Sequence, residues 1–202
     1  RDAFRAWLDA KYPGEDHSNV EIPTVEERSA GDIGHLRHPI KSRFVIDHYE
    51  FYNERVAEDA ERCCRTIKEA VTKDALVGIY YGYTFECAVQ FNNVEDFGHL
   101  ALRRILHSPY VDFLSTMNHY WDRPLGGFSW SFGPLADSCR VHDMLFFGED
   151  ENMTWLNRRN DSATEIYVWR APDADAANNI FKRSFACLAT HGQHEAIADL
   201  NG

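Results

Sequence analysis

The chain has 202 residues, of which 44% are hydrophobic and 13% are aromatic, and its formal net charge at pH 7 is −11. This composition is typical of a globular protein and argues against intrinsic disorder. The negative charge disfavours a nucleic-acid partner, because neutralising phosphates requires clustered Lys and Arg. No apolar run approaches the roughly 20 residues that span a bilayer, so we expect no membrane partner. The five cysteines show no Cys-x-x-Cys spacing, which disfavours a zinc site.

The first part of the chain is predicted to be helical. An amphipathic helix opens it, with Phe4, Trp7 and Leu8 at i, i+3 and i+4. Residues 13–43 are polar, rich in turn formers and predicted to be irregular. A long helix is then expected over residues 45–71, where apolar side chains recur at steps of three and four.

Strands and helices alternate in the rest of the chain. In order, we predict a strand at 75–83, a helix at 96–107, a strand at 111–117, a short helix at 135–139, a strand at 144–147, a helix at 173–190 and a strand at 196–200. This alternation predicts an α/β fold with a parallel sheet. Four strands match one half of a (β/α)8 TIM barrel, which needs about 250 residues. A small doubly wound domain is disfavoured, because no glycine-rich phosphate loop follows any strand.

Polar and aromatic side chains follow three of the predicted strands. Glu149 is the best catalytic candidate, because it follows a strand of the buried type and the C-terminal ends of barrel strands carry catalytic groups. Aromatic rings can cover the apolar faces of sugars, and a pair of carboxyl groups can break a glycosidic bond. The predicted ligand is therefore a carbohydrate. The candidate substrate-binding residues are Tyr81, Tyr83, Glu86, Asn118, His119, Tyr120, Arg123, Trp130 and Glu151.

Structural explanations for the same residues stay open. Tyr81 and Tyr83 could simply pack in the core, because strand tyrosines are usually packed. Glu151 could cap the next turn, and the histidine after the second strand could be an ordinary loop residue. His191 and His194 lie close together in the sequence, but no third ligand accompanies them. We therefore predict no metal site and no cofactor.

Several short motifs follow one another along nearly the whole chain. They are Phe4-Arg5-x-Trp7-Leu8-x-x-Lys11-Tyr12, Val77-Gly78-Ile79-Tyr80-Tyr81-Gly82-Tyr83-Thr84-Phe85-Glu86, Gly98-His99-Leu100-Ala101-Leu102, Ser108-Pro109, Asp112-Phe113-Leu114, Arg123-Pro124-x-Gly126-Gly127, Phe147-x-Glu149-x-Glu151-x-x-Thr154 and Thr190-His191-Gly192. This series resembles the β-galactosidase-type glycoside hydrolases of family 42 and their relatives.

The resemblance implies a retaining glycosidase built on a (β/α)8 barrel. In the family the nucleophile ends the seventh strand, which makes Glu149 the candidate, and the acid/base ends the fourth strand. The acid/base would then lie upstream of Arg1. We accordingly expect residues 1–202 to be the C-terminal half of the catalytic domain, with the N-terminal half missing, and the isolated fragment to be inactive. The resemblance also allows a homo-oligomer of the full-length protein.

The chain departs from the family pattern near the candidate nucleophile. Glu151 and Met153 stand where relatives tend to carry Asp and Arg, and Asp143-Met144 stands where they carry a Gly-Lys step. The sugar and the linkage are therefore left open, as is the localisation. One alternative function is a non-catalytic carbohydrate-binding or interaction protein on a degenerate barrel. Another is a metal-dependent barrel hydrolase, which would need clustered His and carboxylate ligands at the strand ends.

Overall fold

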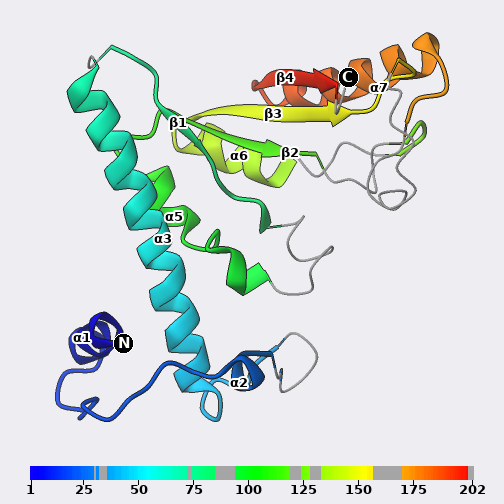
Figure 1. The fold of residues 1–202 in the computed structure, drawn as a ribbon. Helices are drawn as coiled ribbons and strands as arrows, with labels where there is room; N and C mark the ends of the chain where they lie inside the picture. Colours follow the sequence, from blue (N-terminus) through cyan, green and yellow to red (C-terminus); the bar gives the residue numbers. More distant parts are fainter. Residues whose placement is uncertain are drawn as a thin grey trace.

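The computed structural model describes residues 1–29, 31, 36–71, 74–84, 94–118, 124–127, 133–156 and 170–199. Its centre is a four-stranded, fully parallel sheet in the order β1-β2-β3-β4, which is also the order along the chain (Figure 1). The strands are β1 (Gly78–Tyr80), β2 (Phe113–Met117), β3 (Leu145–Asn152) and β4 (His194–Asp199). The predicted α/β fold with a parallel sheet is thus confirmed.

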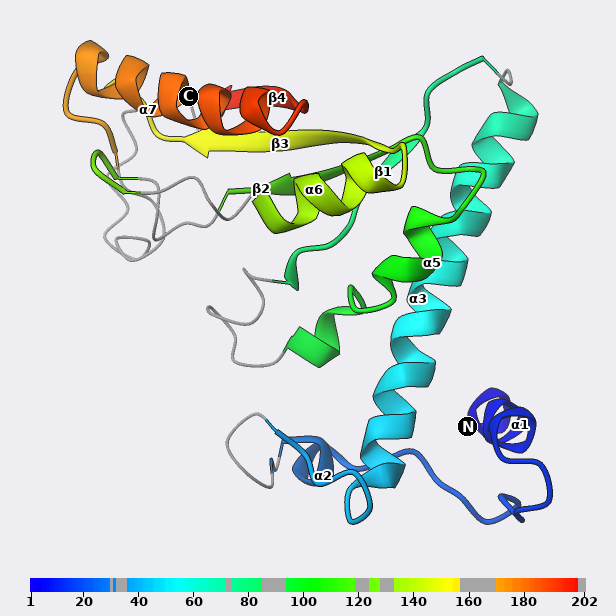
Figure 2. The same ribbon diagram turned by 180° about the vertical axis from the view of Figure 1, so that it is seen from behind.

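Helices connect the strands and extend the molecule beyond the sheet. They are α1 (Asp2–Lys11), α2 (Val25–Ser29), α3 (Arg43–Ala70), the 3-10 helix η1 (Val94–Phe97), α5 (Leu102–Leu106), α6 (Gly133–Val141) and α7 (Ala174–Thr190). Both α6 and α7 cover the same side of the sheet, which is turned to the viewer in Figure 2. The long helix α3 runs from the β1 side of the sheet to α1 and α2 at its far end. Among the described helices, none has the length and apolar composition to cross a lipid bilayer.

The side chains of β3 alternate between the two sides of the sheet. Phe146, Asp150 and Asn152 are buried on the side that packs against α6 and α7, which we call the helix face. Phe147, Glu149 and the other odd-numbered side chains are half-buried on what we call the opposite face. This alternation follows from the two-residue period of an extended strand. It decides which polar groups of β3 can meet.

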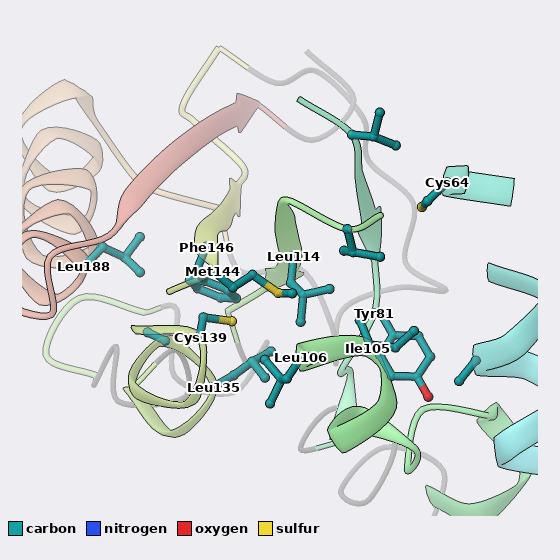
Figure 3. Packing of buried hydrophobic residues seen from close by; sticks show 14 residues of the cluster. Cys64, Tyr81, Ile105, Leu106, Leu114, Leu135, Cys139, Met144, Phe146 and Leu188 are labelled. Carbon is teal, nitrogen blue, oxygen red and sulfur yellow. The ribbon is translucent and has the colours of Figure 1, made fainter. Parts of the chain in front are cut away.

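The main core lies between the sheet and its connecting helices (Figure 3). Leu114 and Phe146 reach it from neighbouring strands, and Ile105 and Leu188 reach it from helices; all four are almost completely buried. Burial of a side chain of this size stabilises a fold by about 1.5–3 kcal/mol relative to leaving it exposed. The core therefore fixes β2 and β3 against α5 and α7, and it provides a rigid support for the ends of these strands.

The motif at the start of the chain has a packing role. Phe4 of α1 is fully buried, and its ring lies 5.5 Å from the ring of His48 on α3. The Lys11 ammonium donates to Asp47 Oδ1 at 2.9 Å, and the Tyr12 hydroxyl donates to the same oxygen at 2.8 Å. Asp47 is only 2% exposed, so these donors replace the water that its carboxylate loses on burial. The motif thus attaches α1 to α3.

Several predicted boundaries were wrong, for identifiable reasons. The region predicted to be irregular contains α2, which begins with a capping box: Thr24 N donates to Glu27 Oε2 at 2.8 Å and Glu27 N donates to Thr24 Oγ1 at 3.2 Å. The helix predicted over 96–107 is divided into η1 and α5. Gly98 separates them with a φ of 78°, a left-handed conformation that a continuous helix does not contain.

The strands also differ from prediction in length. The first was expected over 75–83 but has only three residues, Gly78–Tyr80. The third extends beyond 144–147 to Asn152, and the fourth starts at His194 instead of residue 196. The extension of β3 is stabilised by pairing with β4 from Phe147↔His194 to Asn152↔Asp199. Pairing with a neighbour, which local composition does not show, sets these ends.

Candidate active site

Glu149 lies within β3, close to the C-terminal end of the parallel sheet. It pairs with Met117 of β2 on one side and with Ala196 of β4 on the other. Its own carbonyl oxygen accepts a hydrogen bond from Asn118 N at 3.3 Å. The backbone of Glu149 is thus fixed by two neighbouring strands, and its side chain projects from the opposite face of the sheet. A functional group on such a support has a well-defined position.

The Glu149 carboxylate has a phenol as its immediate partner. Tyr83 Oη donates a hydrogen bond to Glu149 Oε1 at 2.9 Å. The pKa of Tyr83 is raised well above its ordinary value by burial, by the negative charge of Glu149 and by this hydrogen bond. The phenol therefore keeps its proton at all physiological pH values and donates to the carboxylate throughout. The bond holds one carboxylate oxygen of Glu149 in a fixed direction.

His99 supports the segment that carries Tyr83. Its Nδ1 accepts hydrogen bonds from Gly82 N at 3.1 Å and from Tyr83 N at 3.0 Å. Because Nδ1 accepts, the ring proton of a neutral His99 lies on Nε2. Burial lowers the pKa of His99, which favours this neutral form. The ring also stacks on Tyr81, with centroids 4.8 Å apart, and meets Tyr83 edge-on at 5.3 Å.

Gly82 turns the chain between the two tyrosines. Its φ is 96°, and a Cβ built on it would lie 2.8 Å from Leu135 Cδ2. In a regular strand, Tyr81 and Tyr83 would point to the same side of the sheet. The turn at Gly82 instead leaves Tyr81 in the core and brings Tyr83 to Glu149. Both the backbone conformation and the close approach of Leu135 favour glycine at this position.

We expect Gly82→Ala to lower the free energy of unfolding by about 1–3 kcal/mol, because alanine disfavours a positive φ and its Cβ meets Leu135. Gly14→Ala is a matched control, since Gly14 has a φ of 94° but nothing within 4 Å of an added Cβ. Urea unfolding of both variants separates the cost of the backbone conformation from the cost of the clash. Equal losses in the two variants would show that Leu135 does not constrain this turn.

A second polar group lies behind Glu149, on the helix face. Asp150 is fully buried, and its Oδ1 accepts hydrogen bonds from Asn118 Nδ2 at 3.1 Å and from Asn152 Nδ2. Glu195 of β4, which is paired in register with Gly148, also hydrogen-bonds to Asp150. Burial, this hydrogen bond and the charge of Asp150 raise the pKa of Glu195 to about 8. One of the two carboxyl groups therefore carries a proton at neutral pH.

The structure brings together only some of the predicted site residues. Tyr83 and Glu149 are in direct contact, and Glu151 lies on the same face, within β3 instead of at the start of a turn. Tyr81 is only 2% exposed in the core, where its hydroxyl donates to Gly98 O at 2.9 Å. Asn118 is buried on the helix face beside Asp150. The predicted residues outside the described part of the chain are Glu86, His119, Tyr120, Arg123 and Trp130.

The histidines near the C-terminus have other partners. His191 Nδ1 lies 2.9 Å from Asp137 Oδ1, and the His194 ring stacks on Phe147 with centroids 5.4 Å apart. Phe147 also meets Phe113 edge-on at 5.0 Å, so an aromatic row crosses three strands on the face that carries Glu149. In the described ranges, no group of three or more His, Cys, Asp or Glu side chains is arranged to hold a metal ion.

Two features of this region were not predicted as parts of the site. The aromatic row of Phe113, Phe147 and His194 could be found only once the register of β2, β3 and β4 was known. His99 had a weak signal, because Gly98-His99 belongs to the motifs that carry the resemblance. Comparison with known proteins found no family model, no curated protein and no solved structure that matches this chain.

Proposed function

We propose that this chain is the C-terminal half of the catalytic barrel of a retaining glycoside hydrolase, with Glu149 as the nucleophile. The observation that carries the proposal is the contact between Tyr83 Oη and Glu149 Oε1 at the C-terminal end of a parallel sheet. Active sites of (β/α)8 barrels lie at this end of the strands. The order of motifs along the chain, which resembles family 42, also supports the proposal.

The proposed reaction has two steps. Glu149 attacks the anomeric carbon through its second carboxylate oxygen, and the bond to the leaving oxygen breaks while a separate carboxylic acid protonates that oxygen. Water then attacks the glycosyl ester, loses a proton to the same acid/base group, and releases Glu149 as a carboxylate. In this proposal the acid/base comes from a barrel strand outside the chain described here.

Tyr83 has a positioning role in this mechanism. A hydrogen bond from a phenol to one carboxylate oxygen restricts rotation of the carboxylate, so the other oxygen keeps its direction toward the sugar. The phenol cannot act as a base, because its pKa is raised by burial and by the adjacent charge. In the proposed mechanism Glu151, which lies on the same face of β3, accepts hydrogen bonds from sugar hydroxyls.

Trapping of the glycosyl ester tests the proposal directly. The full-length protein would be incubated with a 2-deoxy-2-fluoro glycoside that has a good leaving group. The fluorine destabilises the oxocarbenium-like transition states of both steps, and the good leaving group restores the rate of the first step only, so the glycosyl ester accumulates. We expect mass spectrometry of the digest to show one added sugar on the peptide that contains Glu149. A label on another carboxylate would contradict the assignment. Sugar binding with neither label nor turnover would instead support a non-catalytic carbohydrate-binding protein.

We expect Tyr83→Phe to lower kcat for an aryl glycoside by about 10–100-fold, because a hydrogen bond to a charged group contributes about 1.5–3 kcal/mol. KM should change little, since the proposed role of the phenol is to orient Glu149. Tyr80→Phe is a suitable control, because Tyr80 is 71% exposed at the end of β1. Steady-state kinetics of the two variants would contradict this role if both retained wild-type kcat.

A further inference from the structure

We propose that His107 and His142 form a binding site for a divalent transition-metal ion of the zinc, copper or nickel class. His107 follows α5 and His142 follows α6, and their rings meet with centroids 4.8 Å apart. Both side chains are exposed. The site lies where the chain enters β2 and β3, at the end of the sheet opposite Glu149, so it is independent of the proposed glycosidase activity.

The hydrogen bonds of the two rings fix their tautomers. His107 Nδ1 lies 2.7 Å from Arg103 O, and His142 Nδ1 lies 2.8 Å from Ser138 O. A carbonyl oxygen can only accept, so each Nδ1 carries the proton. In the neutral imidazole each Nε2 then has a free lone pair, which is the form that binds a metal ion. Ligating histidines in metal sites commonly donate their second nitrogen to a backbone carbonyl in this way.

The distance between the rings suits a shared ion. With metal–nitrogen bonds of about 2.0–2.1 Å, the ion lies about 3.2 Å from each ring centroid. Angles of about 90–110° at the metal then place the two centroids about 4.5–5.2 Å apart. The observed separation of 4.8 Å falls within this range. Neither Nε2 has a hydrogen-bond partner among the residues that the structure describes.

The surroundings favour a cation and define the type of site. His142 lines a hollow of about 320 Å³ together with Asp143, the residue that directly follows it, and the whole chain has a formal charge of −11. Asp112 lines the same hollow, but its charge is balanced by an ion pair with Lys68 at 2.7 Å. The described residues offer no cluster of three His, Cys, Asp or Glu ligands, so water would complete the coordination of an ion held by two imidazoles. Imidazole nitrogen binds zinc, copper and nickel, whereas magnesium and calcium require oxygen ligands.

Metal titration tests this proposal. Cys63 is an exposed thiol that could also bind zinc, so the measurements would use a Cys63→Ser background. We expect isothermal titration calorimetry with ZnCl₂ to show one site whose affinity falls by about tenfold or more in His107→Gln and in His142→Gln. Combining the two substitutions should add little, because both remove ligands of one ion. Zinc should also raise the Tm of the parent protein and not that of either variant, since the ion joins the ends of two helices.

His38→Gln is the matched control. His38 Nδ1 accepts from Ile40 N and Lys41 N, so the proton of its neutral ring lies on Nε2 and that ring is not set up as a ligand. This variant should bind zinc like the parent protein, and MgCl₂ should neither bind nor change the Tm of any variant. Unchanged zinc affinity in His107→Gln and His142→Gln, with circular dichroism showing an intact fold, would overturn the proposal. An equal response to magnesium would also overturn it.

Discussion

Replacing Glu149 with glutamine should lower kcat/KM for an aryl glycoside by about 10³-fold or more in the full-length protein. Glutamine has nearly the same shape as glutamate but cannot form the glycosyl ester, so the first chemical step is lost. The fold should persist, because Glu149 is half-buried on the opposite face and its backbone keeps its pairing with β2 and β4. Steady-state kinetics and circular dichroism of the purified variant check both expectations.

Glu151→Gln is the matched control for Glu149→Gln, because the two glutamates lie two residues apart on the same face of β3. It should weaken substrate binding at most moderately and leave the glycosyl ester able to form.

Azide rescue of Glu149→Ala is a second test of the nucleophile. A small anion such as azide can attack the anomeric carbon from the space left by the carboxylate. Restored turnover with an inverted glycosyl azide as product supports the nucleophile, whereas a fully active Glu149→Gln protein excludes it.

The sequence was sufficient to predict the sheet but not its detailed limits. Alternating apolar strands and amphipathic helices imply parallel pairing. Each crossover helix returns the chain to the end of the sheet where the previous strand began, so the next strand runs in the same direction. The short β1 and the break at Gly98 depend on tertiary contacts. A Cβ at Gly98 would lie 2.8 Å from Val56 on α3, a neighbour that is more than forty residues away in the sequence. Such contacts leave no local pattern.

The sequence was sufficient to predict which residues of the candidate site follow the strands, but not on which face of the sheet their side chains lie. Glu149 and Tyr83 were chosen because they follow strands, and the structure brings them together. Tyr81 and Asn118 were chosen for the same reason, but their side chains are buried on the helix face. A shift of one residue, or a turn such as that at Gly82, moves a side chain to the other side of a sheet. Neither can be determined from residue types alone.

The carboxyl pair of Asp150 and Glu195 should make the stability of the protein depend on pH. The pKa of Glu195 is raised from 4.5 to about 8, mainly by burial and then by its hydrogen bond to Asp150. The folded protein therefore holds a proton that the unfolded chain releases above pH 4.5. The free energy of unfolding should fall as pH rises from about 4.5 to about 8, by at most about 1.4 kcal/mol per pH unit. Solvent screening of the half-buried Glu195 makes the slope smaller.

Glu195→Gln isolates this contribution. A glutamine amide can donate to Asp150 without a titrating proton, so the variant should lose this part of the slope and be more stable than the wild type at pH 9. Glu151→Gln, on the other face of β3, should keep the wild-type slope. Urea unfolding between pH 5 and pH 9 gives the free energy of unfolding of the wild type, Glu195→Gln and Glu151→Gln. The contributions of titrating groups that all three proteins share cancel when their free energies are subtracted. Parallel curves for the wild type and Glu195→Gln would mean that Asp150 and Glu195 do not share a proton.

Asp150 directly follows Glu149 in β3, so ionisation of both Asp150 and Glu195 at high pH should also loosen the support of the proposed nucleophile. Loss of activity above pH 8 should then be smaller in Glu195→Gln than in the wild type.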